Sequence, residues 1–306
     1  MLNTPILFLI YNRPDKTLKV FEAIKKVRPA KLFVVADGPR NEEAGILCQQ
    51  TRDVLLNIDW DCELKTLYRT ENIGVKRSVS SGINWFFEHI DEGIVLEDDC
   101  VPNDSFFFFC SAMLEFYKDN ESIMHITGTD LIDNGKKHDY TYYFSNYPNI
   151  WGWATWKRAW RKYDLELTDK SYYKKLINTR FKDPFERRFW HTVLESLKTL
   201  DTWDYQWMFS IWKAGGICIN TNYNFVSNIG FDATATHTKY DSPYSGLTTK
   251  TINKIVHPAT IAIDKETEND FLKTLHNLDR KGYRGYFLMR GKNLIHKIKL
   301  LLKKIK

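Results

Sequence analysis

The chain has 306 residues, of which 43% are hydrophobic and 27% are charged, and its formal net charge is +6. This composition is ordinary for a globular protein with a large core. No stretch approaches the roughly 20 apolar residues of a transmembrane helix, and we find no signal-peptide pattern. Five cysteines without zinc-type spacing favour a reducing compartment over a disulfide framework. We therefore expect a cytoplasmic protein.

The first hundred residues alternate between short apolar runs, which predict buried strands, and segments with helical spacing. We expect strands at 5–11, 31–36, 63–68 and 93–96, and helices at 16–27, 41–56 and up to His89. Strands joined by helices in this order are the pattern of a parallel sheet with crossovers. The sequence therefore predicts an α/β fold with a mixed, mostly parallel central sheet flanked by helices.

Three consecutive carboxylates, Glu97, Asp98 and Asp99, follow the fourth expected strand, and Pro102 is expected to mark its end. Side chains at the carboxyl end of a buried strand lie where open α/β sheets bind ligands. Three acids there repel one another, and a divalent cation would relieve the repulsion. The triplet is therefore either a Mg²⁺ or Mn²⁺ site that holds a diphosphate or an acidic surface turn, with about equal support.

Three other residues in the first half of the chain suggest that it binds a nucleotide. Asp37 follows the second expected strand, where an acidic residue often receives a nucleoside, although Asp-Gly turns are common. Lys76 and Arg77 begin the helix that ends at His89. Cations and a helix N-terminus both favour phosphate, although a solvated basic helix start would have the same composition.

The second half is richer in aromatic residues. We expect a helix at 106–117, a strand at 123–128, a polar loop at 131–147, charged helices within 161–200 and a strand at 215–220. Trp151 and Trp153 flank Gly152, and indole rings are good platforms for sugars. The alternative is a packed aromatic core, which this segment taken alone slightly favours.

Asp204 is expected in the first turn of a helix, with Asp201 or Thr202 as the N-cap. A carboxylate in this place can accept a proton from an acceptor hydroxyl. The alternative is an acidic residue that only favours the helix dipole. His237 ends a Gly/Thr-rich loop, where site residues often lie, although a lone histidine is more often structural.

The end of the chain is basic. Residues 239–263 are expected to be irregular, and the tail is expected to be helical from about residue 269. An apolar stripe at helical spacing lies between lysines and consists of Ile295, Ile298, Leu301, Leu302 and Ile305. Such a helix can lie on an anionic membrane surface, pack on the body of the protein, or fray.

The sequence lacks the P-loop, dinucleotide-binding and nucleophile-elbow patterns. Its short motifs instead resemble those of nucleotide-sugar glycosyltransferases of the GT-A (Rossmann-like) fold, at residues 10–14, 36–38, 72–74, 96–99 and 203–204. The Glu-Asp-Asp form of the acidic triplet is most similar to the N-acetylglucosaminyltransferase I group. The resemblance spans about residues 5–240 and is strongest in the first 110.

The resemblance implies a role for each residue of the donor site. Arg13 and Asp37 would hold the nucleotide, with Asp37 reaching the uracil. Glu97 and Asp98 would also bind the donor nucleotide, with Asp98 contacting the ribose or the donor sugar. Asp99 would bind Mn²⁺ or Mg²⁺.

The resemblance also extends to the chemistry. Asp204 matches the acidic residue that acts as the catalytic base in that group, and His237 could match a late histidine directed at the metal or the diphosphate. Trp151, Trp153 and the basic tail do not belong to the pattern of the animal enzymes, and they point to a different acceptor, such as a lipid-linked glycan in a bacterium.

These observations predict a metal-dependent glycosyltransferase that moves a sugar from a UDP-sugar to an oligosaccharide or lipid-linked glycan, by inversion, in bacterial surface polysaccharide synthesis. Residues 1–120 would bind the nucleotide sugar, 121–245 would bind the acceptor and carry the base, and 246–306 would form an extension that places the enzyme on the inner face of the membrane. The alternatives are a non-catalytic carbohydrate- or membrane-binding protein and a nucleotidyltransferase that makes an NDP-sugar. The charge is concentrated at the C-terminus, so nucleic acid is not an expected partner.

Overall fold

The computed structural model describes residues 1–132, 139–231 and 244–276. Eight of the described strands form one sheet: β1 Ile6–Ile10, β2 Lys31–Ala36, β3 Glu63–Tyr68, β4 Glu92–Glu97, β6 Ile123–Thr127, β7 Tyr142–Ser145, β8 Trp153–Trp156 and β9 Ile217–Thr221. Two short strands pair separately: β5 Cys100–Pro102 and β10 Val226–Asn228. The helices are α1 Pro14–Val27, α2 Glu42–Asp53, η1 Val54–Asn57, α3 Val75–His89, α4 Asp104–Phe116, α5 Lys157–Trp160, α6 Lys170–Arg180, α7 Pro184–Ser196, α8 Asp204–Lys213 and α9 Lys265–His276.

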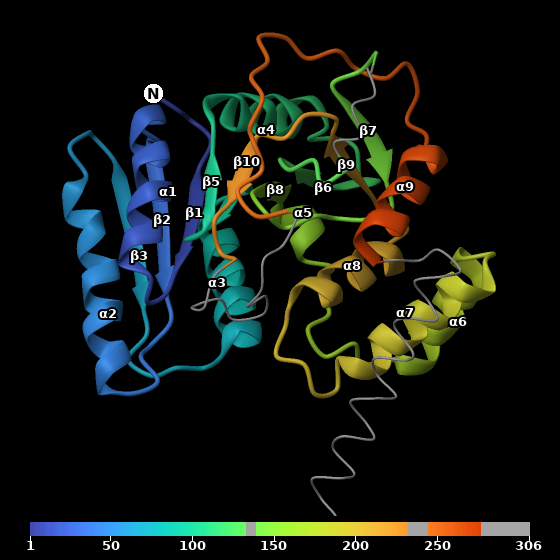
Figure 1. The fold of residues 1–306 in the computed structure, drawn as a ribbon, viewed down its shortest axis with the longest axis horizontal. Coiled ribbons are helices and arrows are strands. Elements are labelled where there is room, and N and C mark those ends of the chain that lie inside the picture. The colour runs from blue at the N-terminus through green and yellow to red at the C-terminus, as the bar shows by residue number, and fades with distance from the viewer. Residues whose placement is uncertain (133–138, 232–243, 277–306) are drawn as a thin grey trace, which may run out of the picture.

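The strand order of the large sheet is β3-β2-β1-β4-β8-β6-β9-β7 (Figure 1). Strand β1 pairs in parallel with β2 and β4, and β2 pairs in parallel with β3. Strand β8 runs antiparallel to both β4 and β6, β9 is parallel to β6, and β7 is antiparallel to β9. The predicted mixed, mostly parallel sheet is therefore confirmed. Because β1, β2 and β4 are parallel, the residues that follow them meet at one edge of the sheet.

Helices cover both faces of the sheet. Successive side chains of a strand point to opposite faces, and in β1 every residue is buried. Ile6, Phe8 and Ile10 pack in the core under α1 and α4. Leu7 and Leu9 pack in the core under α3 and the helices α6 to α8. An apolar run without alternation therefore fits a strand that is covered on both sides.

The prediction of a polar loop at 131–147 is wrong where β7 lies. All four residues of β7 are buried. The hydroxyl groups of Tyr142 and Tyr117 lie 2.6 Å apart, so a buried partner satisfies the polar end of the Tyr142 ring. The tyrosines in this segment led to the prediction of a loop, although aromatic residues are common in strands. Residues 133–138 of the expected loop lie outside the described residues.

The last helix that the structure describes is α9, which begins at Lys265 rather than near residue 269, where the helical tail was predicted to begin. Phe271 and Leu272 are buried in the same core as α8, so this helix packs on the body of the protein. The basic stripe beyond residue 276 lies outside the described residues. Among the helices that the structure describes, none is long and apolar enough to cross a membrane.

Candidate active site

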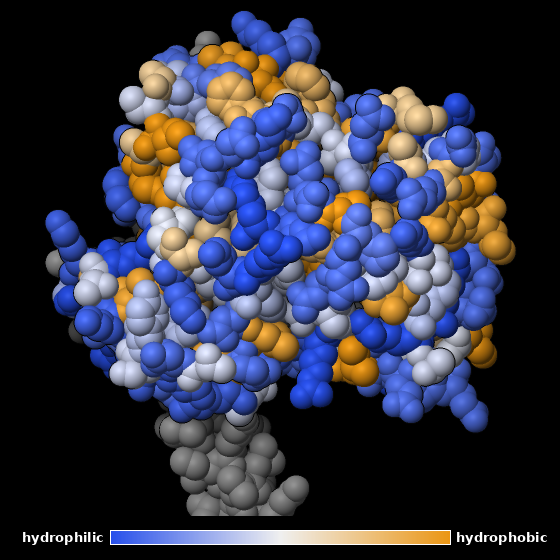
Figure 2. Space-filling view, turned by 180° about the vertical axis from the view of Figure 1, so that it is seen from behind, coloured by the Kyte–Doolittle hydropathy of each residue, from blue (hydrophilic) through white to orange (hydrophobic). Residues whose placement is uncertain are grey.

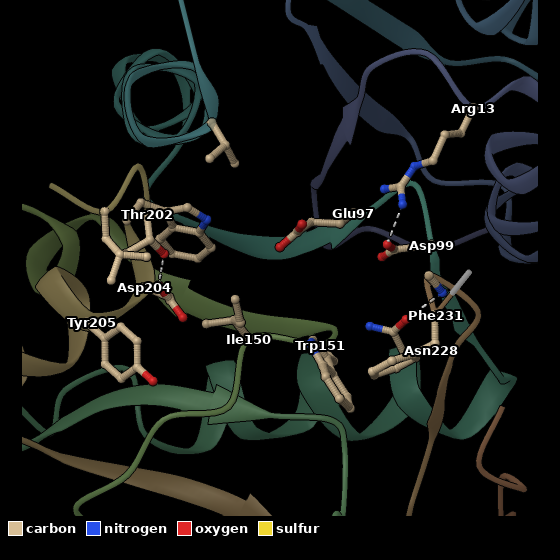
Figure 3. Close-up of a pocket in the computed structure, with 14 residues that line it drawn as sticks. Arg13, Glu97, Asp99, Ile150, Trp151, Thr202, Asp204, Tyr205, Asn228 and Phe231 are labelled. Carbon is tan, nitrogen blue, oxygen red and sulfur yellow. Dashed lines mark hydrogen bonds and ion pairs between the residues drawn. The ribbon is translucent and has the colours of Figure 1, made fainter. Parts of the chain in front are cut away.

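A cavity of about 600 Å³ lies at the carboxyl ends of β1 and β4. Arg13 reaches it from the loop after β1, and Glu97 and Asp99 reach it from the end of β4. Figure 3 shows Glu97 and Asp204 pointing toward one another across this space, from β4 and from the start of α8. The structure therefore brings together five of the predicted site residues, namely Arg13, Glu97, Asp99, Trp151 and Asp204.

The acidic triplet lies in a tight turn between two strands. Strand β4 ends at Glu97, the chain turns at Asp98 and Asp99, and it continues as β5. The expectation that Pro102 ends the buried strand is therefore wrong, because Pro102 belongs to β5, which pairs with β10. The backbone N–H of Ile229 donates to the Asp99 carbonyl oxygen at 2.8 Å, so the chain after β10 holds the turn in place.

Arg13 is the cation that holds two of the three carboxylates. Its guanidinium pairs with Asp98, and its Nη1 lies 2.9 Å from Asp99 Oδ2. The backbone N–H of Tyr11 also donates to Asp98, at 3.3 Å. Burial raises the pKa of Asp98 to about 6, although Arg13 works in the opposite direction. The structure thus directs Arg13 at the carboxylates, and its contact with a nucleotide stays a prediction.

Among the residues that the structure describes, none forms an ion pair with Glu97. Its Oε1 is buried and has no hydrogen-bond partner among the described residues. Burial, followed by the neighbouring charges of Asp99 and Asp98, raises the pKa of Glu97 to about 8. In the described part of the chain, Arg13 alone faces these three carboxylates. A bound cation would relieve the repulsion among them.

The residues present fit a divalent cation that a substrate helps to bind. No group of three or more His, Cys, Asp or Glu side chains in the described part of the chain is arranged to hold a metal. Mg²⁺ commonly uses one or two carboxylates together with substrate phosphates and water. Asp99 and Glu97, which both line the cavity, can supply those carboxylates. His237 lies outside the described residues.

Asp204 is the first residue of α8, as predicted for the first turn. The hydroxyl of Thr202 donates to Asp204 Oδ1, which fixes the orientation of the carboxylate. The N-cap residue is Trp203, without a side-chain cap, so the prediction that Asp201 or Thr202 caps this helix is wrong.

Asp201 instead caps a different helix. Its carboxylate accepts from the backbone N–H groups of Val75 and Lys76, at 3.2 and 3.0 Å, at the N-terminus of α3. The Nζ of Lys76 lies 3.3 Å from Glu166. Neither Lys76 nor Arg77 lines the cavity. The helix start that was predicted to hold phosphate therefore already carries a carboxylate from the loop that leads to Asp204.

Asp37 is buried and is not among the residues that line this cavity. One of its oxygens accepts from the N–H groups of Gly38 and Ile73, at 2.9 and 3.2 Å, and the other accepts from Asn72 Nδ2 at 3.0 Å. Burial raises its pKa. In this structure Asp37 orders the loop at 72–74, and its contact with uracil stays a prediction.

The two tryptophans around Gly152 have different environments. Trp151 lines the cavity, edge-on to Phe231 with ring centroids 5.4 Å apart. Trp153 is completely buried in β8 and stacks on Trp203, with ring centroids 5.7 Å apart. The prediction that Trp153 binds the acceptor is therefore wrong, because no face of its indole is accessible to a sugar.

Several lining residues were not predicted from the sequence, namely Val75, Ile150, Leu200, Tyr205, Asn228, Gly230 and Phe231. Asn228 Oδ1 accepts from the N–H of Gly230 at 2.7 Å, and a Cβ at Gly230 would overlap Asp99 Oδ2. The Asn-x-Gly spacing was a usable turn signal. Its contact with Asp99 depends on a strand pair that the sequence did not reveal.

No family model matches the chain, and no curated protein matches it. Among solved structures, it is similar to residues 1–349 of TarS from S. aureus, with 9% identity and a TM-score of 0.40, over 74% of this chain and 60% of that one. It is also similar to mouse xyloside xylosyltransferase 1, with 12% identity and a TM-score of 0.33, over 69% and 81% of the two chains.

A third similar structure is the 4-diphosphocytidyl-2C-methyl-D-erythritolsynthase of Anaerococcus prevotii DSM 20548, with 12% identity, a TM-score of 0.33 and coverage of 62% of this chain and 84% of that one. Two of these similar proteins are named a xylosyltransferase and a synthase, and the resemblance to the N-acetylglucosaminyltransferase I group stays a prediction. At these identities and scores, the function has to be argued from the residues of this chain.

Proposed function

We propose that this protein is a metal-dependent, inverting glycosyltransferase that moves a sugar from a UDP-sugar to a glycan or lipid-linked glycan of a bacterial surface polysaccharide. The observation that carries the proposal is one cavity with Glu97 and Asp99 on one side and Asp204 on the other. Transfer of a sugar needs a place for the diphosphate and a base for the acceptor, and this arrangement separates the two.

On the donor side, Asp99 and Glu97 would hold Mn²⁺ or Mg²⁺, with His237 as a further candidate. A bound cation would neutralise the charge that develops on the leaving diphosphate. Arg13 holds the turn through its ion pairs with Asp98 and Asp99. The volume of about 600 Å³ lies within the roughly 300–1,000 Å³ of small-molecule sites.

On the acceptor side, Asp204 takes the proton of the acceptor hydroxyl while that oxygen attacks the anomeric carbon and the bond to the diphosphate breaks. Thr202 keeps the carboxylate in one orientation through its hydrogen bond. Direct displacement by one oxygen inverts the configuration of the transferred sugar.

Thermal unfolding with UDP, GDP, CMP and ADP, each with and without Mn²⁺, tests the donor side. We expect UDP to raise the melting temperature only when Mn²⁺ is present. Asp99→Ala should abolish the shift. Asp104→Ala is the matched control, because Asp104 is exposed in the first turn of α4 and does not line the cavity. Absence of a shift with every nucleotide contradicts the proposal.

Release of UDP from a panel of UDP-sugars tests the chemistry. We expect Asp204→Asn to keep the UDP and Mn²⁺ shift and to lower turnover by about 10²- to 10⁴-fold, the usual contribution of a general base. If the protein instead releases pyrophosphate from UTP and a sugar 1-phosphate, it is a nucleotidyltransferase. Nucleotide binding without either reaction favours the non-catalytic alternative.

A further inference from the structure

Among the described strands, β3 forms one end of the eight-stranded sheet and pairs with β2 alone. The two strands pair in parallel over the full length of β3. The backbone N–H of Glu63 donates to the Ala30 carbonyl oxygen at 2.9 Å, so the odd-numbered residues of β3 form the hydrogen bonds to β2. The N–H and C=O groups of Leu64, Thr66 and Tyr68 therefore point away from β2. Among the described residues, none pairs with these backbone groups.

The opposite end of the same sheet is covered by the chain itself. Strand β7 ends the sheet there, and the N–H of Asp264 donates to the Phe144 carbonyl oxygen of β7 at 2.9 Å. Just before β7, the N–H of Thr141 donates to the Val256 carbonyl oxygen, also at 2.9 Å. Residues 256–264 thus run beside β7 and pair with its free edge. In the part of the chain that the structure describes, no segment does the same for β3.

The free edge of β3 presents exposed side chains without charge. Leu64 is 40% exposed and Tyr68 is 36% exposed, and Thr66 is exposed between them. Figure 2 shows apolar side chains on this side of the molecule, at the right of that view, and Leu56 in η1, which leads into β3, is 83% exposed. Strand β3 is six residues long and contains neither a proline nor a register shift. Such an edge is a template for pairing with another strand.

We propose that two copies of this chain form a dimer in which their β3 strands pair antiparallel across a two-fold axis. Thr66 lies at the axis, opposite Thr66 of the second copy, and Leu64 lies opposite Tyr68 of the second copy. The two eight-stranded sheets then become one continuous sheet. A two-fold dimer uses the same surface on both copies, so one strand supplies both sides of the contact. The dimer does not depend on the proposed enzymatic function.

Backbone geometry restricts the registers that such a pair can adopt. In an antiparallel pair, residues that exchange hydrogen bonds lie directly opposite one another. Leu64, Thr66 and Tyr68 must therefore face the same three residues of the second copy, and with Thr66 at the axis all of them are bonded. Threonine opposite threonine and an aliphatic side chain opposite an aromatic one are favourable cross-strand pairs. The exposed apolar side chains of the edge are then covered by one another.

The side chains of β3 favour this register over its neighbours. With Thr66 at the axis, Lys65 lies opposite Leu67 of the second copy. A shift of two residues in one direction places Lys65 opposite Lys65 of the second copy, and like charges directly opposite are destabilising. The same shift in the other direction leaves Leu64 opposite Thr70, beyond the end of β3. The strand is therefore complementary to itself in one register, as expected of a strand that pairs with its own copy.

Sedimentation velocity over a range of concentrations tests the dimer on the full chain, and we expect a dimer that dissociates on dilution. Thr66→Pro removes the N–H at the axis from both copies and should weaken dimerisation at least tenfold. Proline is tolerated on an edge strand where the N–H would face outward. Thr66→Lys places two like charges at the axis and should also weaken the dimer. Thr179→Lys is the matched control, because Thr179 is exposed in α6, away from β3.

Disulfide cross-linking under copper–phenanthroline oxidation tests the register. Opposite Cα atoms of a hydrogen-bonded antiparallel pair lie about 5.5 Å apart, within the range of a disulfide, so Thr66→Cys should cross-link two copies. Lys65 lies diagonally from Lys65 of the second copy, at about 7–8 Å, so Lys65→Cys should cross-link much less. Both variants are made with Cys62→Ser, because Cys62 is the native cysteine that is not buried.

Three results would overturn the proposal: a monomer at every concentration, a dimer that Thr66→Pro and Thr66→Lys leave as strong as the wild-type dimer, or equal cross-linking of Thr66→Cys and Lys65→Cys. Circular dichroism shows whether each variant is folded, and Thr66→Lys keeps the test open if Thr66→Pro is not. No residue of β3 lines the cavity of the proposed active site, so we expect the same UDP and Mn²⁺ shift in wild type and in Thr66→Lys. The proposed function therefore stands or falls separately from the dimer.

Discussion

Asp201 joins two parts of the site that are far apart in the chain. Its carboxylate accepts from the N–H groups of Val75 and Lys76 at the start of α3, and it stands three residues before Asp204. We expect Asp201→Ala to lower the free energy of unfolding by about 1–2 kcal/mol. An N-cap contributes about 1 kcal/mol, and a negative charge at a helix N-terminus contributes about 0.3–1 kcal/mol more. Asp201→Asn keeps one acceptor oxygen and should lose about half as much.

The same substitution should also slow turnover, because the loop that orients Asp204 loses its anchor. A misplacement of about 1 Å can lower a rate by 10²-fold, so we expect turnover to fall by about ten- to a hundredfold while the UDP and Mn²⁺ shift persists. Urea denaturation monitored by circular dichroism gives the stability, and UDP release gives the rate.

Asp169→Ala is the matched control for Asp201→Ala. Asp169 caps α6 by accepting from the N–H of Tyr172 at 2.9 Å, so it caps a helix from the adjacent residue rather than from a distant loop. We expect a similar loss of stability and an unchanged rate. The reasoning is refuted if the free energy of unfolding of Asp201→Ala lies within about 0.3 kcal/mol of the wild-type value. It is also refuted if Asp201→Ala and Asp169→Ala slow turnover equally.

The remaining predictions concern three other contacts. His125 is completely buried, and burial lowers its pKa to about 3, so the folded protein keeps its imidazole neutral. Its contribution to the free energy of unfolding is therefore complete above pH 6.5. As the pH falls from 6.5 toward 3, the free energy of unfolding decreases by about 1.4 kcal/mol per pH unit. Urea denaturation of His125→Gln should therefore show a smaller loss between pH 7 and pH 5 than wild type, by about 2 kcal/mol. Thr202→Val removes the hydrogen bond to Asp204 and should lower kcat about tenfold or more without changing KM for the donor, since bonds to charged groups contribute about 1.5–3 kcal/mol. Gly230→Ala should weaken the Mn²⁺-dependent UDP shift, because a Cβ there overlaps Asp99, and overpacking costs about 1–3 kcal/mol.

Each of these predictions has a result that contradicts it. Equal loss of stability for wild type and His125→Gln on acidification would mean that His125 is not held neutral. A changed KM with an unchanged kcat would show that Thr202 serves binding rather than the orientation of Asp204. Gly45→Ala controls for Gly230→Ala, because a Cβ at Gly45 would meet only the Pro39 Cβ, at 4.0 Å; equal UDP shifts in both variants would contradict the crowding at Asp99.

The sheet and the acidic turn could be predicted because local signals determine them. Apolar runs such as that of β1 read as buried strands, and parallel strands place their carboxyl ends at one edge, so Glu97 and Asp99 were expected at a site. The contact of Asp201 with α3 could not be predicted from the sequence, because 126 residues separate Asp201 from Val75. Strand β10 is three residues long, which was too short to recognise. The contact between Gly230 and Asp99, which depends on this strand, could therefore not be predicted.

The tryptophans were the most misleading signal, and their actual role concerns Asp204. Trp203 stacks on Trp153 immediately before Asp204, and Trp207, one turn further along α8, donates to His125 Nδ1 at 3.2 Å. A general base works only if its carboxylate is held within a fraction of an ångström of the proton that it takes. Large buried rings fix the start of a helix well because they have few rotamers and bury much apolar surface. The aromatic composition that indicated a sugar platform therefore contributes mainly to holding Asp204, the proposed base, in position.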